Sequence, residues 1–160
     1  MTNIDETRYV RCPYAQARDY LHESLQPASQ SKLPQTVRLT ATVPATGIEL
    51  AKQVRVEYAP ATDAMHFDEP WSVRWTPDGG VYPSFEGQLT VRADESYVCC
   101  TLELEGKYAP PGGAVGRAFD AALGKKIAQE TAQNLLSAIG FEFEARYNNE
   151  EAAKHVERTV

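Results

Sequence analysis

The spacing of apolar residues changes twice along the chain, and the changes divide it into three parts. Residues 13–25 place apolar side chains on one face at helical spacing, with a proline suited to the first turn. From residue 36 to residue 104 the period is two, and after residue 113 it is helical again. A short strand at residues 9–12 precedes the first helix. The pattern predicts a strand, a helix, a series of strands and one long helix.

The middle of the chain contains five predicted strands. Apolar and polar residues alternate in each, and turn-forming residues such as those at 77–80 separate them. One apolar face per strand, with short connections, is typical of an antiparallel sheet covered on one side. The apolar face consists of Val37, Leu39, Ala41, Val43, Val54, Val56, Tyr58, Trp71, Val73, Trp75, Phe85, Gly87, Leu89, Val91, Ala93, Val98, Cys100, Leu102 and Leu104.

The final helix is predicted over residues 114–144 and carries one broad apolar stripe. The stripe consists of Val115, Ala118, Phe119, Ala122, Leu123, Ile127, Thr131, Leu135, Ala138 and Ile139. It is wide enough to lie across a whole sheet, so we expect an α+β fold in which a curved antiparallel sheet grips this helix. Residues 1–147 are interpreted as a single domain, and residues 148–160 as a charged, frayed tail.

Composition narrows the class of protein. The chain has 160 residues, of which 42% are hydrophobic and 24% charged, which excludes disorder of the whole chain. It has 16 Lys and Arg against 22 Asp and Glu, a net charge of −6. This acidic balance argues against nucleic-acid or anionic-membrane binding, since both need clustered basic residues.

The cysteines and the N-terminus suggest a cytoplasmic protein. Cys12, Cys99 and Cys100 are odd in number and lie at no disulfide or zinc spacing, so we interpret them as three buried thiols in a reducing compartment. Residues 1–11 contain no apolar signal-peptide core. No apolar run approaches the roughly 20 residues needed to span a bilayer, so stable membrane insertion is not expected.

The end of the sheet region carries a family resemblance. Residues 102–120 are interpreted as a last strand, a Pro-Pro-Gly-Gly break and a helix entry. This segment, together with the element order over residues 7–147, resembles the START-related or SRPBCC superfamily. Its helix-grip fold is shared by lipid-transfer START domains, the Bet v 1 pollen-allergen group and aromatase/cyclase proteins. The resemblance implies a hydrophobic cavity between the sheet and the last helix and leaves the chemistry open, since members include carriers, cyclases and chaperone activators.

The candidate cavity wall comes from the inward strand face and the helix stripe. A twisted sheet cannot touch a straight helix along its whole length, which leaves room for a ligand. The alternative is that these side chains fill the core completely. The candidate ligand-binding residues are Trp71, Val73, Trp75, Phe85, Leu89, Val54, Val56, Tyr58, Phe119, Leu123 and Ile127.

Catalytic residues cannot be assigned from the sequence. The chain has no nucleophile, metalloprotease, phosphate-loop or dinucleotide motif, and no cofactor or metal is expected. His22 and His155 are interpreted as surface residues. One group of polar candidates lies on the strand positions assigned to solvent: Arg74, Glu86, Tyr82, Thr101 and Glu103. A second group lies in the loop before the third of these strands: Asp63, His66, Asp68 and Glu69. That loop is either an ordinary polar loop or a site that binds a metal or acts as acid and base.

Three functions remain open from the sequence. The first is binding or carriage of a small hydrophobic molecule, such as a lipid, polyketide or aromatic compound, in the cavity. The second is a polyketide cyclase, dehydratase or hydrolase acting in the same cavity, which needs at least two polar or ionisable groups pointing inward. The third is an interaction module, either a homodimer or a regulator of another protein.

Overall fold

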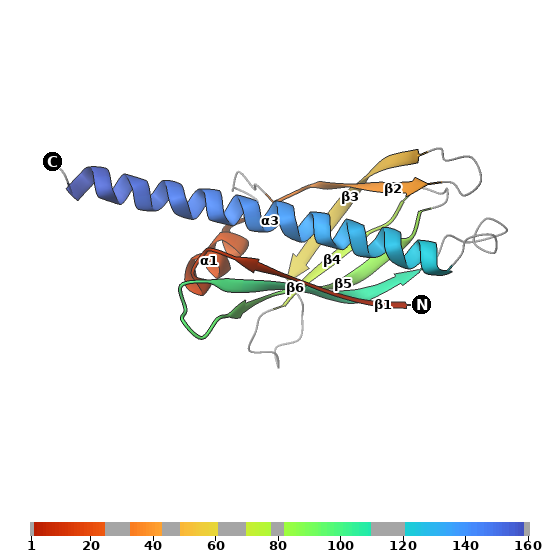
Figure 1. The fold of residues 1–160 in the computed structure, drawn as a ribbon, viewed down its shortest axis with the longest axis horizontal. Coiled ribbons are helices and arrows are strands. Elements are labelled where there is room, and N and C mark those ends of the chain that lie inside the picture. Colours follow the sequence, from red (N-terminus) through yellow and green to blue (C-terminus); the bar gives the residue numbers. More distant parts are fainter. Residues whose placement is uncertain are drawn as a thin grey trace.

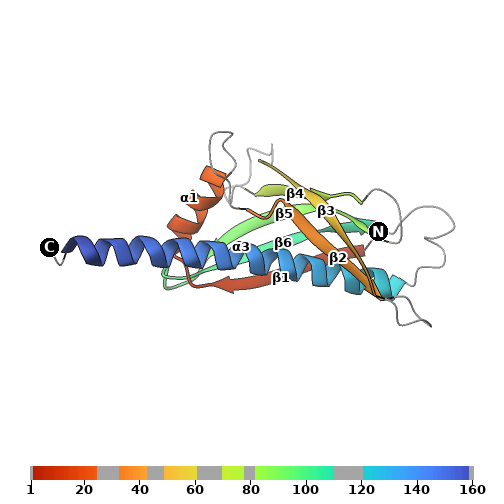
Figure 2. The same cartoon turned by 90° about the horizontal axis from the view of Figure 1, so that it is seen from above.

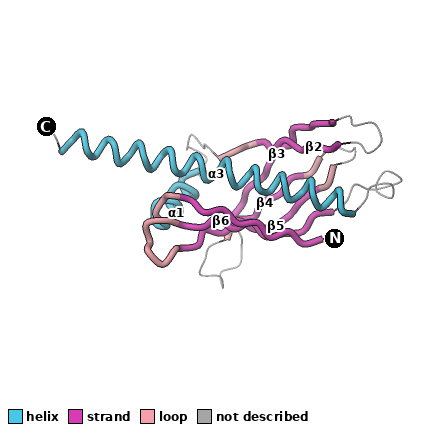
Figure 3. The backbone as a smooth tube through the Cα atoms, in the orientation of Figure 1, coloured by secondary structure: helices cyan, strands magenta, loops and turns pink. Residues whose placement is uncertain are grey.

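The sheet and its covering helix follow the predicted α+β order (Figures 1 and 3). The computed structural model describes residues 2–24, 33–42, 49–60, 70–77, 82–109 and 121–158. Their elements are β1 (Thr2–Val10), α1 (Tyr14–Ser24), β2 (Thr36–Thr42), β3 (Glu49–Pro60), β4 (Trp71–Trp75), β5 (Ser84–Ala93), β6 (Cys100–Ala109) and α3 (Ala121–Arg158).

The sheet is antiparallel throughout, with the strand order β1-β6-β5-β4-β3-β2. Helix α3 crosses its concave face and lies closest to β1, β6 and β2, that is, to the two sides of the sheet. The central strands β4 and β5 lie under the middle of the arch, and α1 packs at the end of the sheet where α3 leaves it (Figures 1 and 2).

The first strand is longer than predicted and begins earlier. Glu6 and Arg8 occupy inward positions of β1 and interrupt the apolar alternation. Both have polar partners on α3: Gln133 Nε2 donates to Glu6 at 2.9 Å, and Arg8 Nη1 donates to Ser137 Oγ at 3.0 Å. The predicted strand at residues 9–12 was therefore wrong in its bounds, because the helix above this edge supplies polar contacts.

The predicted apolar faces are largely confirmed, with errors at the ends of elements. Val98 is 63% exposed because residues 94–99 form the turn between β5 and β6, in which Tyr97 has a φ of 58°. Ala93 is exposed at the end of β5, and Ala138 is exposed on the outer side of α3. Val43, Val115 and Ala118 lie outside the described residues, and the side chains of Ala41 and Ala122 are likewise not described.

Helix α3 continues well past the predicted end at residue 144. Its last turns extend beyond the sheet, where there is no apolar surface to bury, so the hydrophobic stripe ends although the helix does not (Figure 2). Glu, Ala and Lys are good helix formers, and Lys154 pairs with Glu151 at 2.9 Å within this segment. Residues 148–158 are thus helical rather than frayed. In the described part of the chain, neither helix combines the length and apolar character that crossing a membrane requires.

Candidate functional site

The concave face brings together most of the predicted cavity wall. Trp71, Val73, Trp75, Phe85, Leu89, Val54, Val56 and Ile127 are all buried. Tyr58 is partly buried and packs against this core. Phe119 lies outside the described residues, and although Leu123 lies in α3 its side chain is not described. The strand alternation therefore assigned every described candidate to the correct face, while their role in binding stays a prediction.

Strand register places three of these side chains, and one further residue, in one row. Val56 pairs with Trp75, Trp75 with Phe85, and Phe85 with Tyr108, so the row crosses β3, β4, β5 and β6. Tyr108 is 3% exposed and was not among the candidates, because the predicted last strand ended at Leu104. Its position could have been found by continuing the alternation through Gly106 to Tyr108.

An aromatic stack lies along this row. The rings of Trp75 and Phe85 are 4.3 Å apart between centroids and inclined by 17°. The tip of the Phe85 ring lies against two glycines that face each other across β5 and β6, Gly87 and Gly106. A Cβ on either glycine would lie 2.6 Å from Phe85 Cζ. The ring tip therefore occupies the space that a side chain at position 87 or 106 would need.

Few polar groups reach this face among the described residues. Thr131 of α3 is buried, and its Oγ1 donates to Ile127 O at 2.7 Å. Thr90 is also buried but lies in the outward phase of β5, between Leu89 and Val91. Tyr58 donates to Pro34 O at 2.7 Å, and burial raises the pKa of its hydroxyl. The hydroxyls of Thr131 and Tyr58 are thus used within the protein. The indole Nε1 of Trp75 is buried and has no hydrogen-bond acceptor within the described residues.

The predicted polar candidates do not converge on the concave face. Arg74 and Glu86 are exposed on the convex face, where Arg74 pairs with Glu57 at 2.6 Å and thereby lowers the pKa of that carboxyl. Glu103 pairs with Arg92 at 2.7 Å, and Thr101 is half-buried on the same side. Exposed pairs of this kind contribute little to stability. They indicate a solvated outer face.

Tyr82 was assigned to solvent, and this was wrong: it is 8% exposed. It lies before β5 begins, outside the regular strand, so the alternation of that strand does not apply to it. Residues 63, 66, 68 and 69 of the predicted polar loop (Asp63, His66, Asp68 and Glu69) lie outside the described residues. Within the ranges that the structure describes, no three His, Cys, Asp or Glu side chains could hold a metal ion.

Two hollows open near the ends of the central strands. One, of about 420 Å³, is lined by Arg74, Thr76, Ser84, Phe85, Glu86, Lys107, Tyr108 and Ala109. The other, of about 240 Å³, is lined by Lys52, Gln53, Val54, Arg55, Glu57, Arg74 and Thr76. Charged side chains of the convex face line both, so neither is the apolar cavity predicted between the sheet and α3.

The thiols and histidines lie apart from the Trp75 and Phe85 stack. Cys12 and Cys100 are buried, and burial is the main cause that raises the pKa of each thiol to about 12. Cys99 is only partly buried, contrary to the prediction, because it ends the exposed turn before β6. His22 and His155 are exposed as predicted, and the ring of His22 contacts Trp71 edge-on.

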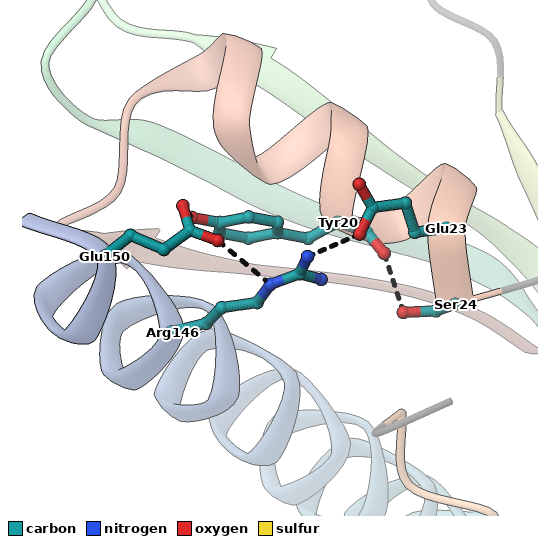
Figure 4. Close-up of polar contacts among 5 residues, drawn as sticks. All are labelled: Tyr20, Glu23, Ser24, Arg146 and Glu150. Carbon is teal, nitrogen blue, oxygen red and sulfur yellow. Dashed lines mark hydrogen bonds and ion pairs between the residues drawn. The ribbon is translucent and has the colours of Figure 1, made fainter. Parts of the chain in front are cut away.

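A polar cluster joins α1 to α3 at the other end of the sheet (Figure 4). Arg146 pairs with Glu23 and with Glu150, and its guanidinium lies 4.1 Å from the centroid of the Tyr20 ring. The Tyr20 hydroxyl donates to Glu150 Oε2 at 2.6 Å. The cluster holds α1 against the part of α3 that leaves the sheet.

This cluster predicts a loss of stability at alkaline pH. Burial and the hydrogen bond to Glu150 raise the pKa of Tyr20 above its ordinary value of 10.0. Above pH 10 the unfolded chain therefore loses this proton while the folded chain keeps it, and the free energy of unfolding falls by about 1.4 kcal/mol per pH unit. Tyr20→Phe should remove this part of the slope, measured by denaturant unfolding at several values from about pH 8 to pH 11.

The comparison of Tyr20→Phe with the wild type isolates this one group. Tyr58, Cys12 and Cys100 also have raised pKa values, but they are present in both proteins and contribute equally. Equal slopes for the two proteins above pH 10 would show that Tyr20 ionises as easily in the folded chain as in the unfolded one.

Solved structures share this architecture. A protein from Thermus thermophilus matches with a TM-score of 0.53 at 16% identity, over 91% of this chain and 99% of its own. The Zhui aromatase/cyclase from Streptomyces sp. R1128 matches with a TM-score of 0.51 at 15% identity, over 91% of this chain and 94% of its own. A conserved protein from Geobacillus kaustophilus gives 0.53 at 14% identity, over 89% and 95%.

These likenesses concern the fold alone, because the identities are low. No family model and no curated protein sequence matches the chain. The structural match extends over nearly the whole chain and includes an aromatase/cyclase, one of the groups that the segment at residues 102–120 resembles. The chain therefore has a helix-grip α+β fold, in which a curved antiparallel sheet holds a long C-terminal helix.

Proposed function

We propose that this protein binds a small, largely apolar molecule between the concave face of the sheet and α3. The observation that carries the proposal is the way α3 spans the sheet. It approaches β1 and β6 on one side and β2 on the other, while the aromatic stack of Trp75 and Phe85 lies on the central strands beneath the arch.

The chemistry of this face suits such a ligand. Over the central strands its buried side chains are mostly aliphatic or aromatic, and burying apolar ligand surface contributes about 25 cal/mol per Å². Apolar walls with few polar groups are typical of small-molecule sites. A cyclase or dehydratase acting here would need ionisable groups pointing into the ligand site. The described residues bring none of Arg74, Glu86 or Glu103 to this face. The ionisable side chains at inward positions of β1, Glu6 and Arg8, are held by hydrogen bonds to α3 at the side of the sheet. We therefore favour binding or carriage over catalysis.

Displacement of Nile red from paired variants tests the proposal. Ile127 is 3% exposed on the sheet side of α3, whereas Lys125 is exposed on the same helix. We expect Ile127→Trp to fill the space and weaken binding at least tenfold, which corresponds to about 1.4 kcal/mol, while Lys125→Trp leaves it unchanged. Native mass spectrometry of the purified protein should show a bound apolar molecule that the first variant lacks.

Stability of the same variants separates a cavity from a filled core. Overpacking a filled core costs about 1 to 3 kcal/mol, whereas a ring that enters existing space costs less. A wild-type protein that binds no dye, combined with an Ile127→Trp variant that loses stability in this range, would show that the core is filled and that the proposal is wrong.

A further inference from the structure

The indole of Trp75 has a buried donor for which the described part of the chain supplies no acceptor. Trp75 is 1% exposed, and its Nε1 has no hydrogen-bond partner among the residues that the structure describes. A buried tryptophan N–H usually finds a partner, because leaving it unpaired forfeits the hydrogen bond that it makes to water in the unfolded chain. An orphaned donor inside a native protein therefore requires an explanation.

Arg8 is the other such case in the described chain, and it differs in kind. Its Nε is also buried and without a partner, but the same guanidinium donates to Ser137 through Nη1 at 3.0 Å. A Cβ on Gly140 of α3 would lie 3.1 Å from this Nε, so the atom is enclosed between strand and helix. The Trp75 side chain has a single donor, and no residue in the described ranges accepts from it.

The position of Trp75 places this donor in the proposed ligand site. It is the last residue of β4, on the concave face, in register with Val56 and Phe85. The strand is central, under the arch that α3 makes over the sheet. Stacking on Phe85, whose ring tip lies against Gly87 and Gly106, restricts rotation of the indole and so fixes the direction of its N–H.

We propose that the Trp75 N–H donates a hydrogen bond to an oxygen of the bound molecule, and that the ligand is a neutral aromatic compound bearing a carbonyl-type oxygen. This rests on the proposed function. The ligand is neutral because the row around the donor, formed by Val56, Trp75, Phe85 and Tyr108, carries no charged side chain, and a buried charge needs a partner of opposite sign. The charged side chains at inward positions of β1, Glu6 and Arg8, are bound to Gln133 and Ser137 of α3. It is aromatic because the surface beside the donor is a pair of stacked rings.

Two matched ligands isolate the hydrogen bond. Fluorene and 9-fluorenone are flat and neutral and differ by a methylene in place of the carbonyl. We expect the wild-type protein to bind 9-fluorenone about tenfold more tightly than fluorene in Nile red displacement, after correction for their partition between water and an apolar solvent. Trp75→Phe keeps an aromatic ring and removes the N–H, so it should abolish this preference: the smaller ring changes the affinity for both ligands alike, and the ratio of the two affinities should fall to about one.

Trp71→Phe provides the matched control. Trp71 lies on the same strand and face, is 7% exposed, and contacts His22 at the other end of β4. This variant should keep the preference for 9-fluorenone. A preference lost with Trp71→Phe and kept with Trp75→Phe would overturn the assignment to Trp75.

A spectroscopic measurement on the wild-type protein covers the case in which Trp75→Phe fails to fold. The chain has two tryptophans, so the indole signals in a ¹⁵N spectrum can be assigned with either variant. The Trp75 indole proton should move downfield with 9-fluorenone and not with fluorene. Equal binding of both ligands without this shift would overturn the inference and leave the proposed function in place. Failure of both ligands to displace Nile red would instead contradict the proposed function.

Discussion

Gly106→Ala should destabilise the protein by about 3 kcal/mol or more, because the added methyl group meets backbone atoms that cannot move aside alone. A Cβ at this position would lie 2.5 Å from Glu86 O, 2.6 Å from Gly87 Cα and 2.6 Å from Phe85 Cζ. The Glu86 oxygen and the Gly87 α-carbon belong to the backbone of the neighbouring strand, so β5 and β6 would have to separate. The ring of Phe85 would also be displaced from its contact with the two glycines.

Urea unfolding of Gly106→Ala and of Gln88→Ala measures this effect against a control. Gln88 lies next to Gly87 in β5 but is exposed on the convex face, so its substitution should change the free energy of unfolding by less than about 0.5 kcal/mol. Gly87→Ala should resemble Gly106→Ala, since its Cβ would lie 2.4 Å from Glu105 O. A loss below about 1 kcal/mol for both glycine variants would show that the strands are farther apart than described.

Phe143→Ala should cost about 3 to 5 kcal/mol, whereas Phe141→Ala should cost almost nothing. The two phenylalanines lie two positions apart on α3 and present opposite environments. Phe143 is 2% exposed and its ring lies 5.9 Å from that of Tyr20, while Phe141 is 70% exposed. Removing the buried ring loses its transfer free energy and leaves a cavity, and removing the exposed ring does neither.

The two variants test which side of α3 faces the core, because they share the residue type, the helix and the substitution and differ only in burial. Chemical unfolding followed by circular dichroism gives the two differences in free energy. Equal losses for the two variants would mean that the helix is rotated from its described orientation. A large loss for Phe141→Ala alone would mean that its outer side is the buried one.

The faces of the strands could be predicted because a strand has a period of two, so one phase of the pattern is the buried one. Trp71, Val73 and Trp75 were assigned on this basis, and all three are buried. The first strand could not be delimited in the same way. Its inward positions include Glu6 and Arg8, whose partners are more than a hundred residues away in sequence, and local alternation carries no information on such contacts.

The sequence predicted which residues form the candidate site, but not how their side chains contact one another. The contact of the Phe85 ring with Gly87 and Gly106 depends on a register that brings the two glycines together. That the Trp75 indole has no acceptor among the described residues depends on what surrounds it in three dimensions. The far end of α3 was missed because it buries little, and its helicity comes from side-chain preferences and local ion pairs instead of an apolar stripe.

The place of β1 in the sheet has a consequence for synthesis on the ribosome. It is the first strand to be made, yet its neighbour is β6, which ends roughly a hundred residues later. At a translation rate of about 5 to 20 residues per second, β6 is complete roughly 5 to 20 seconds after β1 has been synthesised. During that interval its backbone amides have no strand to pair with, so the nascent chain depends on speed of translation or on chaperones to stay free of aggregation.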